Sequence, residues 1–145
     1  MKVQIKKLSP DAVIPYRGSE QAAGYDVYAV NTEDFVVKKG ETLMVKTGLA
    51  FVIPDGYFGG IFARSGLASK QGIRPANCVG VIDSDYRGEL MVPLHNDTDT
   101  DQVLKAHERI AQLVILPYLA VEFEETDTLS DTARGESGFG STGKQ

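Results

Sequence analysis

Asp83 is placed where a general base would need support, directly before a tight turn. It follows a run of β-forming residues at 79–82, and residues 84–88 supply turn formers and a glycine that tolerates a positive φ. The alternating run 90–94 then predicts a second strand, so the whole stretch predicts a β-hairpin. A hairpin would hold the carboxylate in a defined position, as general-base catalysis requires. An isolated turn aspartate is nevertheless more often a simple turn former.

The C-terminal residues could add a cation and backbone amides. Residues 126–145 contain only two sizeable apolar side chains, Leu129 and Phe139, and such a segment buries too little to offset its ordering entropy. Arg134 and the run Gly-Phe-Gly-Ser-Thr-Gly at 138–143 favour a closing lid over a solvated tail. The run nearly matches a P-loop, but glutamine stands where that motif needs Ser or Thr, and we reject that fold assignment.

Short strands are the elements that would position these groups. Alternation and turn signals predict strands at 2–6, 25–30, 41–46, 48–53, 57–63, 109–118 and 121–124. One short helix is predicted at 65–72, with Ser65 as its N-cap and Gly72 as its end. Pro93 inside an alternating run indicates an edge strand or a bulge. Many short strands separated by turns predict an all-β sandwich or barrel.

Composition limits the classes of function. A chain of 145 residues, 42% hydrophobic and 24% charged, is typical of one globular domain. The net charge of −5 argues against a nucleic-acid partner bound through a basic surface. Cys78 is the only cysteine, so no intrachain disulfide forms and a reducing compartment fits. No signal peptide or membrane span is expected, which makes the cytoplasm the default location.

Five separated segments, in order, resemble the five motifs of the homotrimeric dUTPase family. They are residues 23–29, 63–68, 80–88, 108–113 and 134–143, and together they span nearly the whole chain. Each segment alone is weak evidence, but the set of five is highly specific. The resemblance implies a jelly-roll-like β-barrel or sandwich at 1–125 with one short helix, followed by a flexible C-terminal arm at 126–145.

The activity implied by this resemblance is that of a dUTP diphosphatase. Such an enzyme cuts dUTP to dUMP and pyrophosphate, which limits uracil incorporation into DNA and supplies dUMP for thymidylate synthesis. The resemblance assigns catalysis to Asp83, which would hold the attacking water, and to Arg134, a cation for the γ-phosphate. It implies Mg²⁺ as cofactor, with Asp26 receiving one of the metal's waters. The implied substrate-binding residues are Arg64, Ser65, Gly66, Asn77, Val81, Ile82, Tyr86, Met91, Gln112, Phe139, Gly140, Ser141 and Thr142.

Base selection would come from the strand before Asp83. Backbone groups near Val81 and Ile82, with the Asn77 amide, can match the acceptor–donor–acceptor edge of uracil, and cytosine would leave them unpaired. Tyr86 would pack on deoxyribose and leave no room for a 2′-hydroxyl, and Phe139 would stack on uracil. Tyr86 could instead be a surface aromatic of the hairpin.

Several alternatives stay open at this point. Asp26 could be a solvent-facing strand residue, and Arg109 could be a structural partner of an acid. His107 and Ser137 depart from the family pattern, which often has glycine at both places, so the turn at 107 and the properties of the arm could differ. A dCTP deaminase of the same fold, or a dUTP-switched regulatory module that binds proteins, are the alternative functions.

The resemblance also implies that the partner of this chain is a copy of itself. It predicts a closed homotrimer with three sites between subunits. One subunit would supply the segments around Asp26, Ser65 and Gln112. A second would supply the Asp83 hairpin, and the third would supply the arm.

Overall fold

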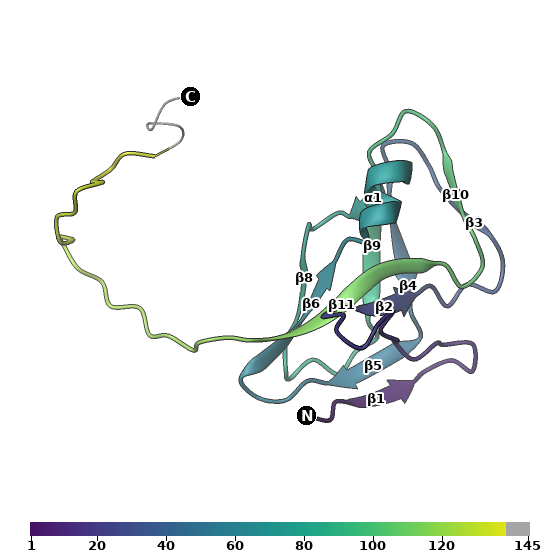
Figure 1. The fold of residues 1–145 in the computed structure, drawn as a ribbon, viewed down its shortest axis with the longest axis horizontal. Coiled ribbons are helices and arrows are strands. Elements are labelled where there is room, and N and C mark those ends of the chain that lie inside the picture. The colour runs from purple at the N-terminus through teal and green to yellow at the C-terminus, as the bar shows by residue number, and fades with distance from the viewer. Residues whose placement is uncertain (139–145) are drawn as a thin grey trace.

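The structure is a computed structural model that describes residues 1–138, and within them a β-rich body is followed by an extended C-terminal segment (Figure 1). The single helix of these residues is α1 (Ser65–Gln71). The strands are β1 (Gln4–Lys7), β2 (Tyr25–Tyr28), β3 (Phe35–Val37), β4 (Thr42–Lys46), β5 (Leu49–Val52), β6 (Tyr57–Phe62), β7 (Ile73–Pro75), β8 (Gly80–Ile82), β9 (Met91–Asn96), β10 (Gln102–Leu104) and β11 (Arg109–Pro117). The predicted all-β class with one short helix is confirmed.

Two antiparallel sheets form the body, and two ribbons complete it. The larger sheet has the order β2-β11-β6-β8, and the second has the order β4-β9-β7. The ribbons are β1-β5 and β10-β3. One buried cluster contains inward side chains of both sheets, such as Val27 and Ile61 from the first and Val92 and Leu94 from the second. The core therefore lies between the sheets, as in a sandwich.

The segment around Asp83 is not the predicted hairpin. β8 pairs with β6, whereas β9 lies between β4 and β7. Residues 83–90 thus cross from one sheet to the other, with a turn in which Tyr86 N donates to Asp83 O (3.2 Å). The hairpin prediction was wrong because alternation identifies a strand and its buried face but does not specify its partner.

Pro93 also lies elsewhere than predicted, in the central strand of its sheet. It faces Met44 of β4, and its carbonyl accepts from Ala76 N (2.7 Å), just beyond the end of β7. The N–H and C=O of one strand residue point to the same side. An N–H at position 93 would therefore point beyond the end of β7. Its absence in proline costs the β7–β9 ladder little hydrogen bonding.

Helix α1 begins and ends close to the predicted positions, but its N-cap differs. The N-cap is Arg64, which makes no side-chain capping bond, so Ser65 is the first helical residue and the Ser65 cap prediction was wrong. The end at Gly72 is confirmed, with φ at 64° in the left-handed region. None of the described residues belongs to a helix of the length and apolarity that a bilayer crossing demands.

The predicted strand at 121–124 is absent from the described chain. The last strand ends at Pro117, and residues 118–138 form neither helix nor strand. Leu119, Val121 and Phe123 are 89%, 65% and 92% exposed, and the segment runs away from the body (Figure 1). A strand needs a hydrogen-bonded neighbour, and the body of this chain offers none to this segment.

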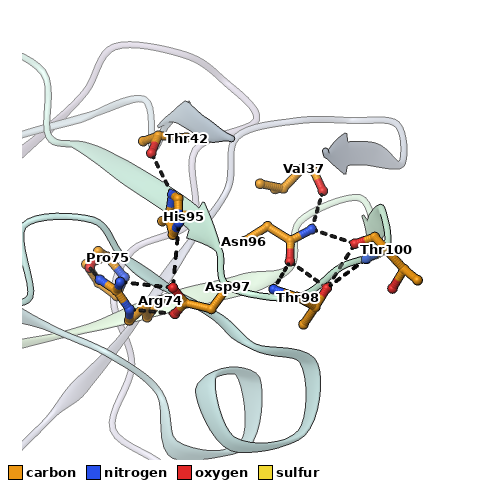
Figure 2. A network of polar contacts seen from close by, with 9 residues as sticks. All are labelled: Val37, Thr42, Arg74, Pro75, His95, Asn96, Asp97, Thr98 and Thr100. Carbon is orange, nitrogen blue, oxygen red and sulfur yellow. Dashed lines mark hydrogen bonds and ion pairs between the residues drawn. The ribbon is translucent and has the colours of Figure 1, made fainter. Parts of the chain in front are cut away.

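A fully buried asparagine ties the loop at 97–101 to β3 (Figure 2). The Asn96 amide nitrogen donates to Val37 O (2.9 Å) and Thr100 O (2.8 Å). Its oxygen accepts from Thr98 N (2.9 Å) and Thr98 Oγ1 (2.7 Å). All the hydrogen-bonding capacity of this side chain is therefore used inside the protein, as burial requires.

An ion pair lies beside this network at the surface (Figure 2). Arg74 binds Asp97 with two bonds, Nε to Oδ2 at 2.6 Å and Nη2 to Oδ1 at 3.0 Å. The Arg74 hydrogen bonds hold the pKa of the Asp97 carboxyl below its ordinary value, and Asp97 raises the pKa of Arg74. His95 links the pair to β4. Its Nε2 lies 3.6 Å from Asp97 Oδ1, and its Nδ1 lies 3.0 Å from Thr42 Oγ1.

Replacing Asn96 tests how much the buried amide contributes to stability. Asn96→Ala removes the amide partners of the buried Val37 O and the partly buried Thr98 N, so we expect the free energy of unfolding to fall by about 3 kcal/mol. The measurement is urea unfolding at one fixed chain concentration. Asp99→Asn, on the exposed part of the same loop, is the control and should change stability by less than about 0.5 kcal/mol. Equal effects of the two variants would contradict the role given to Asn96.

Candidate functional site

Asp83 lies at the rim of an open cavity between the two sheets. The cavity has a volume of about 300 Å³. Its lining residues are Met44, Asn77, Val81, Ile82, Asp83, Tyr86, Glu89, Met91 and Pro93. The structure thus brings together six residues singled out from the sequence, namely Asn77, Val81, Ile82, Asp83, Tyr86 and Met91.

Three lining residues were missed by the sequence analysis. Met44 faces Pro93 across the β4–β9 pair, and no sequence signal could place it there because the pairing of the strands was unknown. Pro93 lies two residues after Met91 on one strand, so alternation could have placed both on the same face. Glu89 follows the turn directly, and its proximity to Asp83 in the sequence was the available signal.

Internal hydrogen bonds hold the turn after Asp83. Arg87 Nη1 donates to Ser84 O (2.6 Å) and to Tyr86 O (3.0 Å), and the Tyr86 hydroxyl donates to Glu89 O (3.0 Å). A Cβ atom at Gly88 would overlap the Tyr86 hydroxyl, so the ring passes directly over this glycine. The turn therefore has its own scaffold and presents Asp83 from a defined backbone.

A second cluster of functional candidates surrounds Asp26. Its Oδ1 accepts from Arg64 Nε (2.9 Å) and its Oδ2 from Arg109 Nη1 (3.2 Å). Arg64 Nη1 also donates to Arg109 O (3.2 Å). Of the two open alternatives, the structure supports a structural pairing of Arg109 with an acid, and Asp26, 17% exposed, is paired rather than free in solvent. Two guanidinium groups and one carboxylate leave this cluster net positive.

Groups suited to oxyanions lie next to this cluster. Ser65 and Gly66 are exposed at the start of α1, where the first intrahelical bond is Ala68 N to Arg64 O (3.0 Å). The preceding amides are therefore free of helix partners. Gln112 Nε2 donates to Ala63 O (2.9 Å), and a Cβ at Gly24 would overlap the Gln112 oxygen. This glycine thus leaves space for the carboxamide.

The two clusters lie at opposite ends of β6. Ile82 faces Gly59, so Asp83 lies beside Phe58, near the beginning of β6, and these two residues also line a second cavity. Arg64 follows the other end of the same strand. At about 3.3 Å per residue, the separation along the strand is about 20 Å. The two clusters of one chain therefore lie far apart, and we refer to each of them as a half-site.

Arg134 lies with neither half-site in the described chain. It is on the extended segment, where its Nε donates to Ser137 O (2.9 Å). Phe139, Gly140, Ser141 and Thr142, which the sequence analysis placed in the substrate site, lie outside the described residues. Their assignment and the division of the chain at Glu125 stay predictions.

The two aspartates differ in what surrounds them. Both oxygens of Asp26 bind arginines, whereas none of the ion pairs within residues 1–138 involves Asp83. Among those residues, no three His, Cys, Asp or Glu side chains are arranged to hold a metal. The residues around Asp26 therefore fit a cation that is held mainly by phosphate oxygens and waters. Each Asp26 oxygen keeps a lone pair that could accept from such a water.

Comparisons with known proteins point to one family. A family model described as dUTPase matches residues 11–143. The deoxyuridine 5'-triphosphate nucleotidohydrolase of Nautilia profundicola is 50% identical to this chain over 144 residues, which is 99% of this chain and 100% of the relative.

Solved structures agree in fold. A dUTPase of Staphylococcus bacteriophage 80alpha with dUpNHpp has a TM-score of 0.90 at 31% identity, covering 99% of each chain. A dUTPase from phage phi11 of S. aureus, described with a structural Mg(II) ion, has a TM-score of 0.81 at 25% identity, covering 90% of this chain and 100% of that one. These neighbours support the predicted jelly-roll-like architecture, here without a closed barrel within the described residues.

Asp26→Asn tests whether this carboxylate organises the arginines. The amide keeps the size of the side chain but loses two charge-assisted bonds, so we expect the free energy of unfolding to fall by about 2 kcal/mol. Denaturant unfolding at fixed chain concentration measures it. Asp55→Asn, in an exposed turn, removes the same charge and should leave stability nearly unchanged. A loss no larger than that of Asp55→Asn would show that the arginines do not depend on Asp26.

Proposed function

The chain belongs to the dUTPase family and hydrolyses dUTP, and we propose that its two half-sites are completed by neighbouring subunits of a homotrimer. The products are dUMP and pyrophosphate, so the reaction removes a source of uracil in DNA and provides dUMP for thymidylate synthesis. The observation that carries the assignment of residues is the Asp83 carboxylate. It has no ion-pair partner in the described chain and borders the cavity that Asn77, Val81, Ile82 and Tyr86 line.

Asp83 acts as the general base in this proposal. Its carboxylate orients a water molecule and accepts a proton as the water oxygen attacks the α-phosphorus. The bond from that phosphorus to the α–β bridging oxygen breaks, and pyrophosphate leaves with the bond's electron pair. Arg64, the Gln112 amide and the free amides at Ser65 and Gly66 bind the phosphates and offset the charge that develops on them.

Uracil selection is assigned to the free edge of β8. This strand ends the order β2-β11-β6-β8, so one side of its backbone has no strand partner in the sheet. Successive residues of a strand direct their N–H and C=O groups to opposite sides, so one of Val81 and Ile82 directs its pair away from β6. That pair can meet the uracil edge in the manner of an added strand, and Asn77 lies beside it. Tyr86 packs on the sugar. Cytosine would leave buried polar groups unpaired and is rejected on that basis.

Mg²⁺ is the proposed cofactor, bound mainly by substrate phosphates. The Asp26 cluster fits this arrangement as an acceptor for metal-bound water rather than as a direct ligand. When bound, the ion neutralises phosphate charge and fixes the geometry of the chain of phosphates. The phage phi11 dUTPase described with a structural Mg(II) ion supports the view that proteins of this fold can bind magnesium. We place the protein in the cytoplasm, consistent with its single cysteine.

The distance between half-sites supports sharing between subunits. Reacting atoms must approach to about 3–3.5 Å, whereas Asp83 and Arg64 of one chain are separated by about 20 Å along β6. Leu119, Val121 and Phe123 alternate along the extended segment and are exposed, so they form an apolar row that another subunit can cover. Arg134 follows this row and can then reach a site that its own body does not contain.

Asp83→Asn tests the general base. The amide keeps the side chain's size but accepts no proton from water, so kcat for dUTP should fall at least about 100-fold while affinity for dUpNHpp stays close to that of the wild type. Pyrophosphate release from dUTP, dTTP, dCTP and UTP, with and without Mg²⁺, is the assay. Asp85→Asn, two residues on, is the matched control. Near-normal kcat in Asp83→Asn would remove this residue from the mechanism.

Mixed trimers test the shared site. One variant carries Asp83→Asn with its C-terminal segment intact, and the other lacks the chain from Ala133 onward but keeps Asp83. Unfolded and refolded together, they should give more activity than the sum of the two alone, because some sites then combine a good base with a good arm from different chains.

If each site were instead built within one chain, every site in the refolded mixture would carry one of the two defects. Each variant refolded alone under the same conditions is the control, and mass measurement must detect mixed trimers. Activity equal to the sum in such a mixture would reject sharing.

A further inference from the structure

We propose that Glu89 is a positioning residue, which fixes Tyr86 and thereby helps the enzyme choose 2′-deoxyribose over ribose. The inference rests on dUTP hydrolysis at the Asp83 cavity, as proposed above. Glu89 borders that cavity, but its carboxylate is directed to the backbone of another element: Oε1 accepts from Gly48 N at 2.9 Å in a partly buried place.

The partner of this carboxylate is a rigid corner between β4 and β5. Gly48 has φ at 68°, and a Cβ there would lie 2.9 Å from the Ala12 Cβ, so neither the conformation nor the space allows another residue to fit without strain. The Gly48 carbonyl accepts from Leu8 N (2.7 Å). A hydrogen bond to this corner therefore attaches Glu89 to a part of the body that cannot easily move.

The next residue is tied to the same corner. Leu90 N donates to Leu49 O (2.7 Å), and the Leu90 carbonyl accepts from Thr47 Oγ1 (2.7 Å), whose residue is fully buried. The turn that follows Asp83 is therefore joined to the body of the protein at Glu89. On the other side of Glu89, the bonds made by Arg87 stay within the turn.

Tyr86 depends on the backbone of Glu89. Its hydroxyl donates to Glu89 O at 3.0 Å, and its ring lies over Gly88. A ring excludes a 2′-hydroxyl only if it does not yield when ribose approaches. The chain of bonds from Gly48 through the Glu89 carboxylate and carbonyl to the Tyr86 hydroxyl holds the ring, so rejection of ribose is expected to weaken when the chain is cut.

The charge of Glu89 supports a structural reason for its presence. A carboxylate on the wall of a cavity that takes a polyanionic nucleotide repels the substrate, so binding alone would favour a neutral side chain. A charged acceptor makes a stronger hydrogen bond to a backbone N–H than a neutral acceptor does. The hydrogen bond from Gly48 N–H to the Glu89 carboxylate therefore supplies the stabilisation that offsets the repulsion of the nucleotide.

The test compares dUTP with UTP in variants at residue 89. Glu89→Ala removes the acceptor, and we expect the ratio of kcat/KM for dUTP to that for UTP to fall by about tenfold or more. Glu89→Gln keeps an oxygen for Gly48 N–H and should retain most of the preference. Glu33→Ala, on an exposed loop, removes the same charge and controls for electrostatic attraction of the substrate. A merely structural loss would lower both activities together and leave the ratio unchanged.

A second variant keeps the proposal testable if Glu89→Ala does not fold. Tyr86→Phe cuts the same chain of bonds at its other end and should lower the ratio similarly. An unchanged ratio in folded Glu89→Ala, or in Tyr86→Phe where the former fails to fold, would overturn the proposal. Failure of the wild type to release pyrophosphate from dUTP would instead reject the proposed function.

Discussion

The pairing of β8 with β6 is the constraint on which the rest of the site depends. It fixes Asp83 beside the beginning of β6, while Arg64 and the start of α1 follow the end of that strand. A strand is stiff along its length, so no side-chain movement brings these groups together. The same pairing leaves β8 at the edge of its sheet, with backbone groups free for a base. Separation of the half-sites and the proposed recognition of uracil thus have one structural origin.

Environment, rather than residue type, assigns the two aspartates their different tasks. Asp26 binds two arginines and is held in place, which fits its proposed role of organising positive charge for an anion. Asp83 lies at a cavity without such partners in the described chain and can bind water. The proposed task of each carboxylate therefore follows from the groups that surround it.

Sequence patterns located most strands of the body, while strand partners depended on contacts that the sequence does not display. Alternation found β9 and turn signals bounded β6, yet the same alternation suggested a β8–β9 hairpin that the sheets do not contain. β3, β7 and β10 have three residues each, too few for a period to be recognised. Four residues of the Asp83 cavity, Val81, Ile82, Asp83 and Tyr86, were found through their place in the motif at 80–88, and Asn77 and Met91 were assigned by the family resemblance outside it. Met44 was missed because it joins the cavity only through pairing with β9.

The predicted strand at 121–124 fits the proposed assembly better than it fits a single chain. Val121 and Phe123 alternate with acids as a half-buried strand would, but in one chain they stay exposed. Burying Leu119, Val121 and Phe123 would contribute about 5–9 kcal/mol, and ordering residues 119–123 would cost about 5–10 kcal/mol in backbone entropy. These amounts nearly cancel, so apolar contact with another subunit would hold the segment only marginally. Strand hydrogen bonds or a bound nucleotide would then decide whether Arg134 reaches the phosphates.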